Sequence, residues 1–409
     1  MPSISDAEIV IVGGGAIGAA AADALAQSGQ RDILLIEKEP SLAAVTTAQA
    51  AGLVGQVRAS IDRVKLAMWS VATFAELQRQ EGARPSWRQV GSLRIAATPE
   101  RAEEFRRLEE TARAAGLEVQ RLDAAEAGRR WPGMRLEKAA AILWCPSDGY
   151  LQPYDLTMAY QQRARRSGVR FATGVRLETI RIEKGRVAEI GTSAGPIRCQ
   201  MLVNAAGAHA YHVAKLAGLE LPIVPVRHEY FISVPINGIR PELPAFRLPD
   251  QTLYGRPDVN GLLLGGWEPE ALSLDPRGYA LADPPPAIQE DWPVLSNFAE
   301  LMAPFYPPAG EAGLRRVMSG WPTFTPDGRF IIGESSRVKG FVMAGGCNAH
   351  GVSGSAGIGR HLVEALNEKA PSPYVRSLSP DRFTERSWDW TEARRRAQAV
   401  YETYYAIGH

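Results

Sequence analysis

The chain has 409 residues, of which 45% are hydrophobic and 22% charged, and its formal net charge at pH 7 is +1. Such a length and composition predict about two globular domains. The balanced charge argues against a nucleic-acid partner, because no basic excess exists to replace the counterions of phosphates.

Three widely spaced cysteines, Cys145, Cys199 and Cys347, indicate neither a disulfide framework nor a metal centre. Residues 1–8 lack the basic start of a signal peptide, and the apolar stretch behind them is interrupted by Asp23. We therefore expect a cytoplasmic protein without a membrane span and without a bound metal.

The N-terminal residues predict a strand, a turn, a helix and a second strand. The apolar run from Ile9 to Val12 precedes glycines at positions 13, 15 and 18, and a second apolar run ends at Glu37. This order is typical of a dinucleotide-binding unit, in which the glycines admit a pyrophosphate and the acid binds a ribose. The glycine pattern alone is weak evidence, but the full order of elements makes dinucleotide binding the favoured interpretation.

Hydrophobic periodicity predicts the later elements in chain order. The first are an extended loop at 41–57, a helix at 62–80, a strand at 89–97, a helix at 99–115, a strand and turn at 139–151 and a helix at 155–167. A strand at 169–172 is followed by further strands through residue 199, a strand at 201–207, one strand at 224–234 and an antiparallel pair of strands at 246–267. The last are a helix at 287–305, a strand at 341–346 and a helix at 358–367.

Three features favour FAD over NAD. No second glycine fingerprint follows a strand, a glycine-rich turn at 345–359 opens another helix, and the small residues at 204–207 end a strand. The late helix start would direct its dipole toward a flavin ring. The alternative interpretations are a flexible turn before a surface helix and a close-packed strand end.

The arrangement of these elements predicts an α/β protein, α+β overall, with a discontinuous Rossmann-like FAD-binding domain and a substrate domain built on a mainly antiparallel sheet. The FAD-binding domain is assigned residues 1–60, 145–222 and 318–370, and the substrate domain residues 61–144 and 223–317. Residues 371–409 are expected to form a tail that packs on the body.

Further segments carry a resemblance to a known family. They are GSLRIAAT at 91–98, DGYLQPYDLTM at 148–158, VNAAG at 203–207, PVRHEY at 225–230, GLLLG at 261–265 and FTPDG at 324–328. The chain resembles the D-amino-acid-oxidase superfamily of FAD amine oxidoreductases, especially the flavin half of dimethylglycine and sarcosine dehydrogenases. The resemblance implies oxidation of a carboxylate-bearing secondary or tertiary amine, such as an N-methylglycine, an iminodiacetate-like compound or an imino acid. Hydride would pass to flavin N5, and the imine would hydrolyse to an aldehyde and an amine.

The resemblance also implies which residues contact FAD. They are Gly13, Gly15, Ala16, Ile17, Gly18, Glu37, Lys38, Thr47, Ala48, Gln49, Gly52, Leu53, Val175, Ala206, Gly207, Gly346, His350, Gly351, Val352, Ser353 and Gly354. The related dehydrogenases often carry a covalently linked histidine where this chain has Gln49, so FAD is expected to be bound non-covalently. They also carry a folate-binding half, whereas this sequence ends at His409, so formaldehyde capture by tetrahydrofolate is not expected within it.

At the substrate face the resemblance places His228 and Tyr254 as catalytic residues. The alternative interpretations are that His228 is a hydrogen-bonded structural histidine and that Tyr254 is a tyrosine of the core. Arg256 shares the strand face of Tyr254 and is a candidate clamp for a carboxylate, whereas His350 would contact flavin or substrate, or cap a helix. Distant relatives, the monomeric sarcosine oxidases, use a lysine near Val352 to bind a carboxylate, and its absence here argues against that binding mode.

The leading hypothesis is a FAD-dependent amine oxidoreductase that uses oxygen or an electron-transfer partner as acceptor and exists as a monomer or a homodimer. An alternative is the flavin subunit of a hetero-oligomeric amine or sarcosine oxidase that requires partner chains. A nicotinamide-dependent dehydrogenase and a non-catalytic binding module are less favoured.

Overall fold

The computed structural model describes residues 5–384 and 388–407, and its first layer is a six-stranded sheet. Five of its strands are parallel, and only the edge strand β20 runs antiparallel to its neighbour. The strand order is β20 (Ile331–Glu334), β21 (Phe341–Gly345), β12 (Met201–Asn204), β1 (Ile9–Val12), β2 (Ile33–Glu37) and β8 (Arg170–Thr173). The sheet thus unites the beginning, the middle and the last quarter of the chain.

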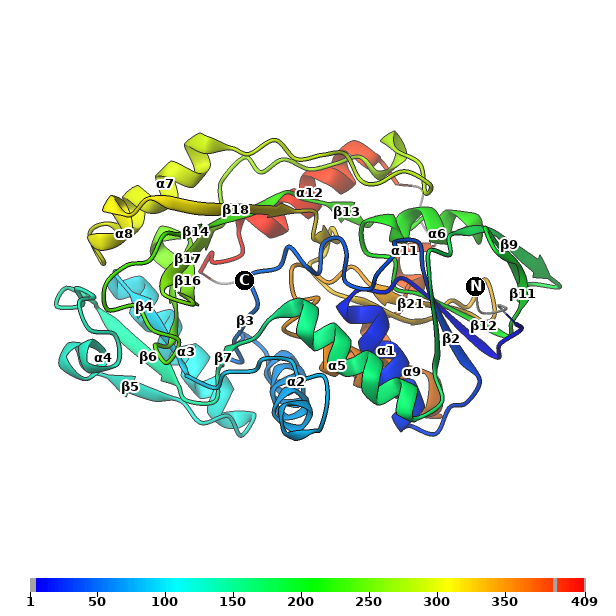
Figure 1. The fold of residues 1–409 in the computed structure, drawn as a ribbon, viewed down its shortest axis with the longest axis horizontal. Coiled ribbons are helices and arrows are strands. Elements are labelled where there is room, and N and C mark those ends of the chain that lie inside the picture. Colours follow the sequence, from blue (N-terminus) through cyan, green and yellow to red (C-terminus); the bar gives the residue numbers. More distant parts are fainter. Residues whose placement is uncertain (1–4, 385–387, 408–409) are drawn as a thin grey trace.

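Three helices cover one face of this sheet (Figure 1). They are α1 (Ala16–Gln27), α5 (Pro153–Arg166) and α9 (Ser355–Asn367). Close packing explains the small residues of α1 and α9, since a Cβ at Gly359 would lie 3.0 Å from both the carbonyl oxygen of Ala20 and the Cβ of Ala24. On the other side of α1, buried Asp23 forms a 2.5 Å ion pair with Arg163 of α5.

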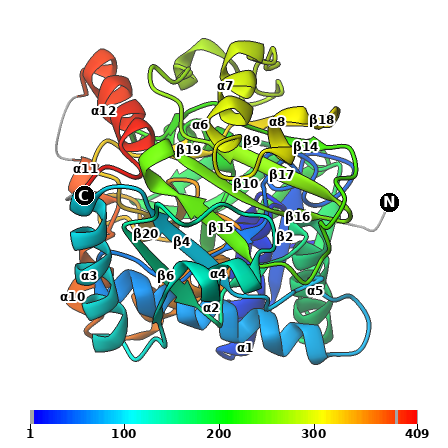
Figure 2. The same ribbon diagram turned by 90° about the vertical axis from the view of Figure 1, so that its left-hand side faces the viewer.

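The second layer is an eight-stranded, largely antiparallel sheet, seen from its side of the molecule in Figure 2. Its order is β18 (Leu314–Gly320), β14 (His228–Ser233), β17 (Gly261–Gly266), β16 (Leu253–Asp258), β15 (Ala245–Leu248), β4 (Ser92–Ala96), β6 (Ala141–Cys145) and β5 (Gln120–Leu122). Helices α3 (Pro99–Ala114), α4 (Ala124–Arg130), α7 (Trp292–Met302) and α8 (Pro308–Glu311) accompany it.

Smaller elements complete the structure. They are β3 (Leu53–Val54) paired with β7 (Gly149–Tyr150), the sheet of β9 (Leu177–Glu183), β10 (Arg186–Thr192) and β11 (Gly195–Arg198), β13 (Val224–Pro225) paired with β19 (Thr323–Phe324), and the helices α2 (Ile61–Arg79), α6 (Ala210–Leu216), α10 (Pro373–Ser377), α11 (Asp381–Thr384) and α12 (Trp390–Glu402). The last helix packs on β13 and β19, between the two large sheets (Figure 1).

The predicted fold class is confirmed, but two predicted strand segments are wrong in detail. Residues 224–234 form two strands in different sheets, β13 and β14, because Pro225 lacks the N–H that would continue a ladder. Residues 246–267 form three strands instead of two, since the chain reverses twice, with Thr252 and Val259 in the left-handed conformation. The domain boundaries assigned from the sequence stay a prediction.

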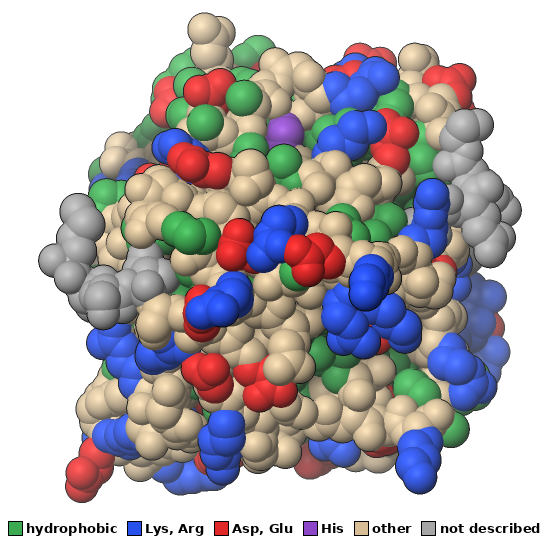
Figure 3. All heavy atoms as spheres, turned by 90° about the vertical axis from the view of Figure 1, so that its right-hand side faces the viewer, with side chains coloured by type: hydrophobic (Ala, Val, Ile, Leu, Met, Phe, Trp, Pro, Cys, Tyr) green, Lys and Arg blue, Asp and Glu red, His purple; other side chains and the backbone are tan. Residues whose placement is uncertain are grey.

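Charged side chains of both signs are interspersed on the face that Figure 3 shows, as a net charge near zero leads one to expect. Within the described ranges, none of the helices combines the length and the apolar character that crossing a bilayer requires.

Candidate active site

The glycine-rich turn after β1 is shaped by contacts that exclude side chains. Gly13 has φ +110°, and a Cβ there would lie 2.5 Å from the carbonyl oxygen of Ala205. A Cβ at Gly18 would lie 1.8 Å from the carbonyl oxygen of Gly13, so α1 approaches the turn as closely as backbone allows. The N-terminus of α1 therefore borders a cavity, and its dipole would favour a phosphate group there.

Glu37 holds the far side of this turn together. Its carboxylate accepts hydrogen bonds from the backbone N–H groups of Gly14, at 2.5 Å, and Glu39, at 2.8 Å. Burial raises the pKa of Glu37, and these two hydrogen bonds oppose that shift. The carboxylate also lines the cavity, at the position from which it would reach a ribose hydroxyl.

Three adjoining cavities run from Glu37 to the eight-stranded sheet. The first contains Gly13, Glu37 and Lys38, and it shares Gly15, Thr46, Thr47, Ala205 and Gly207 with the second. The second shares Thr46, Ala50, Pro322, Ala349 and Val352 with the third, which we call the inner cavity. The inner cavity is lined by side chains that include Gln49, Arg58, His228, Arg247, Tyr254, Trp267, Tyr404 and Tyr405. Together the three form an elongated channel suited to a dinucleotide with a second ring system at its inner end.

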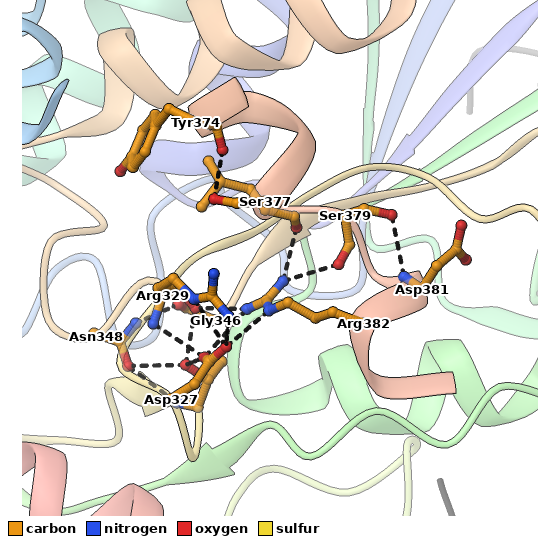
Figure 4. Close-up of polar contacts among 11 residues, drawn as sticks. Asp327, Arg329, Gly346, Asn348, Tyr374, Ser377, Ser379, Asp381 and Arg382 are labelled. Carbon is orange, nitrogen blue, oxygen red and sulfur yellow. Dashed lines mark hydrogen bonds and ion pairs between the residues drawn. The ribbon is translucent and has the colours of Figure 1, made fainter. Parts of the chain in front are cut away.

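The turn after β21 forms the wall opposite the glycine-rich turn. Asn348 and Ala349 have φ angles of 44° and 60°, and for alanine this left-handed conformation is strained. The Asn348 side chain accepts a hydrogen bond from the N–H of Thr325 and donates one to the carbonyl oxygen of Gly346. Arg382 reinforces the adjoining turn through an ion pair with Asp327 (Figure 4). These contacts hold the strained residues in place.

A chain of hydrogen bonds leads away from the inner cavity. Nε2 of His228 lies 2.6 Å from the Tyr254 hydroxyl, and its Nδ1 lies 3.0 Å from the hydroxyl of Tyr401 in α12. Tyr401 in turn donates a hydrogen bond to the carboxylate of Glu268. Burial lowers the pKa of His228 to about 3, so its imidazole is neutral near pH 7.

The hydrogen bonds from Tyr254 to Glu268 have a defined donor-to-acceptor direction when Glu268 is ionised. Because Tyr401 donates its proton to Glu268, its oxygen accepts the proton of His228 Nδ1. The remaining nitrogen of His228 then accepts the proton of Tyr254. The oxygen of Tyr254 is left as a hydrogen-bond acceptor, and every proton in the chain already points toward Glu268.

One row of the eight-stranded sheet forms the floor of this region. Arg94 of β4 is paired with Arg247 of β15, Arg247 with Tyr254 of β16, and Tyr254 with Gly265 of β17. Cross-strand partners share one face of a sheet, so the two arginines stand beside the tyrosine. A Cβ at Gly265 would lie 2.5 Å from the Tyr254 hydroxyl, so glycine leaves the room that this tyrosine needs.

The predicted clamp Arg256 is engaged elsewhere. Its guanidinium donates to the carbonyl oxygen of Ala51 and forms a 3.2 Å ion pair with Asp258. It also lies over the ring of Tyr150 and is absent from the lining of the inner cavity. These contacts fit a structural role, and Arg247 and Arg58 present guanidinium groups to the cavity instead.

Most of the predicted contact residues lie along the channel. The lining includes Gly13, Gly15, Ala16, Ile17, Glu37, Lys38, Thr47, Gln49, Gly52, Leu53, Val175, Ala206, Gly207, Gly351, Val352 and Ser353, together with His228 and Tyr254. Gly18, Ala48, Gly346 and Gly354 lie behind it and shape the turns. His350 faces a neighbouring cavity, where its Nε2 is 3.0 Å from the Tyr404 hydroxyl.

Sequence reasoning missed the arginines and the C-terminal tyrosines. The arginines had a visible signal, because Arg94 and Arg247 each interrupt an otherwise apolar strand. Tyr401, Tyr404 and Tyr405 had none, since nothing local indicates that the last helix returns to the inner cavity.

The fold and the channel are typical of a dinucleotide-binding oxidoreductase of the flavin type, with a Rossmann-like unit at one end of the channel and the eight-stranded sheet at the other. The sequence matches the family described as FAD dependent oxidoreductase (DAO) over residues 8–365, and the chain belongs to this family. The predicted cofactor, FAD, and the predicted class, an oxidoreductase, are thereby confirmed.

Several characterised proteins are similar to the chain. Mitochondrial dimethylglycine dehydrogenase of Rattus norvegicus is 29% identical over 95% of this chain and 46% of its own length. The 4-methylaminobutanoate oxidase (formaldehyde-forming) of Paenarthrobacter nicotinovorans is 30% identical over 92% of this chain and 45% of its own length. The chain thus spans less than half of these relatives. The structure of L-proline dehydrogenase from P. horikoshii superposes with a TM-score of 0.84 at 22% identity, covering 93% of this chain and 98% of that one.

Proposed function

We propose that the protein oxidises a secondary or tertiary amine that carries a carboxylate close to its nitrogen. The observation that carries the proposal is the inner cavity, where the acceptor oxygen of Tyr254 stands beside the guanidinium of Arg247 on adjacent strands. An amine would bind at the first group and a carboxylate at the second. The names of the similar proteins, a dimethylglycine dehydrogenase and a methylaminobutanoate oxidase, support an amine that carries a carboxylate, and in dimethylglycine a single carbon separates the two groups.

The residues along the channel fit FAD. The turn at Gly13 and the start of α1 suit its pyrophosphate, Glu37 suits the adenosine ribose, and the inner cavity suits the ring. Gln49, which lines the inner cavity, offers no nucleophile for a covalent link, so we infer non-covalent binding. Bound FAD supplies the acceptor for a hydride from the carbon next to the substrate nitrogen.

The chain of hydrogen bonds from Tyr254 gives the protein its own part in the reaction. An amine is largely protonated near pH 7, and it must lose that proton before a hydride leaves the neighbouring carbon. The ammonium group would donate to the oxygen of Tyr254, and the proton of Tyr254 would shift to Nε2 of His228. Nδ1 then releases its proton through Tyr401 to Glu268, whose pKa is raised by burial and which can therefore hold it.

The atoms and electrons balance in two steps. Bound FAD would accept the electron pair of the breaking carbon–hydrogen bond, and a carbon–nitrogen double bond would form in the substrate. Water then adds to this imine, and the carbon–nitrogen bond breaks to give an aldehyde, or a ketone from a branched carbon, and a smaller amine. Oxygen or an electron-transfer partner would take up the two electrons that the oxidation releases. Trp267, Tyr404 and Tyr405 wall the inner cavity and limit the access of water to the first step.

Anaerobic titration of the FAD-loaded protein tests the proposal. N-methylglycine, N,N-dimethylglycine, iminodiacetate and L-proline would be compared with N-methylethanolamine, which has a hydroxyl in place of the carboxylate. At least one carboxylate-bearing amine should bleach the flavin absorbance, and N-methylethanolamine should not. Equal bleaching by N-methylethanolamine, or bleaching by none of the amines, would reject the substrate class. Bleaching by the isolated chain would also count against an obligatory partner subunit, and admission of air would show whether oxygen is an acceptor.

A further inference from the structure

Three arginines beside the inner cavity have no acidic partner. Arg94 and Arg247 are paired residues of β4 and β15, and Arg58 follows β3. Among the described residues, no carboxylate oxygen lies within ion-pair distance of any of the three. Arg58 and Arg94 bond the carbonyl oxygen of Val57, at 2.8 and 3.4 Å, and the guanidinium of buried Arg247 has no hydrogen-bond partner in the described part of the chain.

Other buried arginines of the protein are paired. Arg101 contacts Glu104 and Asp250, Arg227 contacts Asp291, and Arg256 contacts Asp258. Pairing is the usual condition for burying a charge, because the loss of water around an ion costs several kcal/mol. Among the described residues, Arg247 is therefore the exception among the buried arginines, and half-buried Arg58 and Arg94 beside it also lack a carboxylate partner. A bound anion would remove this cost.

Like charges add to this cost. Burial, together with the neighbouring guanidinium groups of Arg247, Arg63 and Arg94, lowers the pKa of Arg58 to about 10. Burial and Arg247 likewise lower the pKa of Arg94. The pKa of Arg247 is raised instead, because the effect of its burial is outweighed by nearby groups such as Tyr405 and Asp148. One carboxylate would neutralise only one of the three central cations, so the group has a capacity for more than one negative charge.

The arginines also span two spaces. Arg247 lines the inner cavity, whereas Arg94 lines an outer cavity of about 620 Å³ that reaches α3 and the C-terminal segment. Arg58, Tyr404 and Tyr405 line both. The passage between the cavities therefore has a cationic floor at Arg58 and an aromatic wall formed by the two tyrosines.

Resting on the proposed function, we infer that the substrate is an amine with two carboxylates. The first carboxylate binds at Arg247 next to the reacting amine, and the second binds at Arg58 and Arg94 toward the outer cavity. Iminodiacetate and N-methylated aspartate or glutamate have this chemistry. A neutral or apolar substituent on the amine would leave Arg58 and Arg94 unpaired.

Unreactive thioethers test the second site apart from turnover. Thiodiacetate and (methylthio)acetate carry sulfur in place of the nitrogen and differ in having two carboxylates or one. Each would be titrated into the FAD-loaded protein, with the perturbation of the flavin spectrum as the binding signal. Thiodiacetate should bind about tenfold more tightly or better, the gain expected from one charge-assisted contact.

Arginine variants locate the effect. Arg94→Met should weaken thiodiacetate about tenfold and change (methylthio)acetate by less than about threefold, and Arg94→Lys should recover part of the loss. Arg396→Met is the matched control, because Arg396 is exposed on α12 and lines the same outer cavity. It should leave the preference for thiodiacetate unchanged. Flavin content and thermal unfolding would be measured for each variant, and the lysine variant serves if the methionine variant does not fold.

The possible outcomes separate this inference from the proposed function. Equal affinity for the two thioethers, or equal weakening of both by Arg94→Met, would overturn the second carboxylate site. Flavin bleaching by N-methylglycine would still support amine oxidation in that case. Conversely, selective binding of thiodiacetate without bleaching by any amine would retain the anion site and reject the proposed reaction.

Discussion

Replacing Tyr401 with phenylalanine would interrupt the proton path behind the inner cavity. The substitution removes the acceptor of His228 Nδ1–H and the donor to Glu268, while the ring and its packing against Trp267 and Phe324 remain. Tyr254 and Arg247 keep their places in the cavity lining. A slower reaction would therefore report the broken chain, because the groups proposed to touch the substrate are unchanged.

The magnitude follows from the two lost hydrogen bonds. Both sit in a buried region, and an unsatisfied buried polar group costs about 1–3 kcal/mol. If one such cost raises the activation free energy of the step that removes the proton from the amine, the rate of flavin reduction falls about 5-fold to 150-fold. The proton would also leave less readily, so the rising limb of the rate against pH should move toward the pKa of the free amine, near 10.

Anaerobic stopped-flow reduction of the FAD-loaded protein across pH 6–10 is the assay. The control is Tyr211→Phe, because Tyr211 of α6 packs on Trp390 of α12, the helix of Tyr401, and does not line the three cavities of the channel. An unchanged pH limb and rate in Tyr401→Phe would refute the proton path. A loss of rate at every pH with an unmoved limb would indicate a structural effect only and would equally reject it.

Three further predictions concern stability and cofactor binding. Burial lowers the pKa of His209 to about 4. Between pH 6.5 and 4 the unfolded chain therefore binds a proton at this residue that the folded chain does not bind, and the free energy of unfolding falls with the pH. Urea unfolding should show that His209→Gln loses about 3 kcal/mol less stability over this pH range than the parent protein. Gly13→Ala would place a Cβ 2.5 Å from the carbonyl oxygen of Ala205 at φ +110°, and this variant should purify without flavin colour. Gly116→Ala is the control: at φ +85° an alanine is strained and should lower the unfolding temperature, but its Cβ would have nothing within 4 Å, so the variant should retain FAD. Gly265→Ala should displace the Tyr254 hydroxyl and retain FAD, and the substrate should reduce the flavin about tenfold more slowly than in the parent protein. An unaltered rate of flavin reduction would show that the position of this hydroxyl is unimportant.

Local patterns predicted the cofactor half of the protein well. The glycines before α1 and the acid at the end of β2 indicate a dinucleotide without knowledge of the rest of the fold, because backbone geometry and helix polarity decide the interaction within 30 residues. Helices such as α2 and α3 also begin within two residues of their predicted starts, each behind a side chain that caps the first turn.

The substrate half was less accessible to such reasoning. The alternating residues around Val226 predict a strand but carry no information about its partners, so the change from one sheet to another at Pro225 was invisible. The same limit applies to Arg256, because its acceptor, the carbonyl oxygen of Ala51, lies 205 residues away and leaves no local signal in the sequence. Contacts between distant segments also bring Tyr401 to His228.

The mixed origin of the six-stranded sheet has a consequence for biosynthesis. The strand β1 lies in the interior of a sheet whose strand β21, also in the interior, ends at Gly345, more than 330 residues later. At about 5–20 residues per second, a ribosome needs on the order of tens of seconds to deliver that strand. During this interval the apolar edge of β12 lacks its neighbour, and the wall of the channel formed by Asn348 and Ala349 does not exist. Flavin loading is therefore a late event in the maturation of the chain, and the half-built sheet is the species that chaperones would recognise.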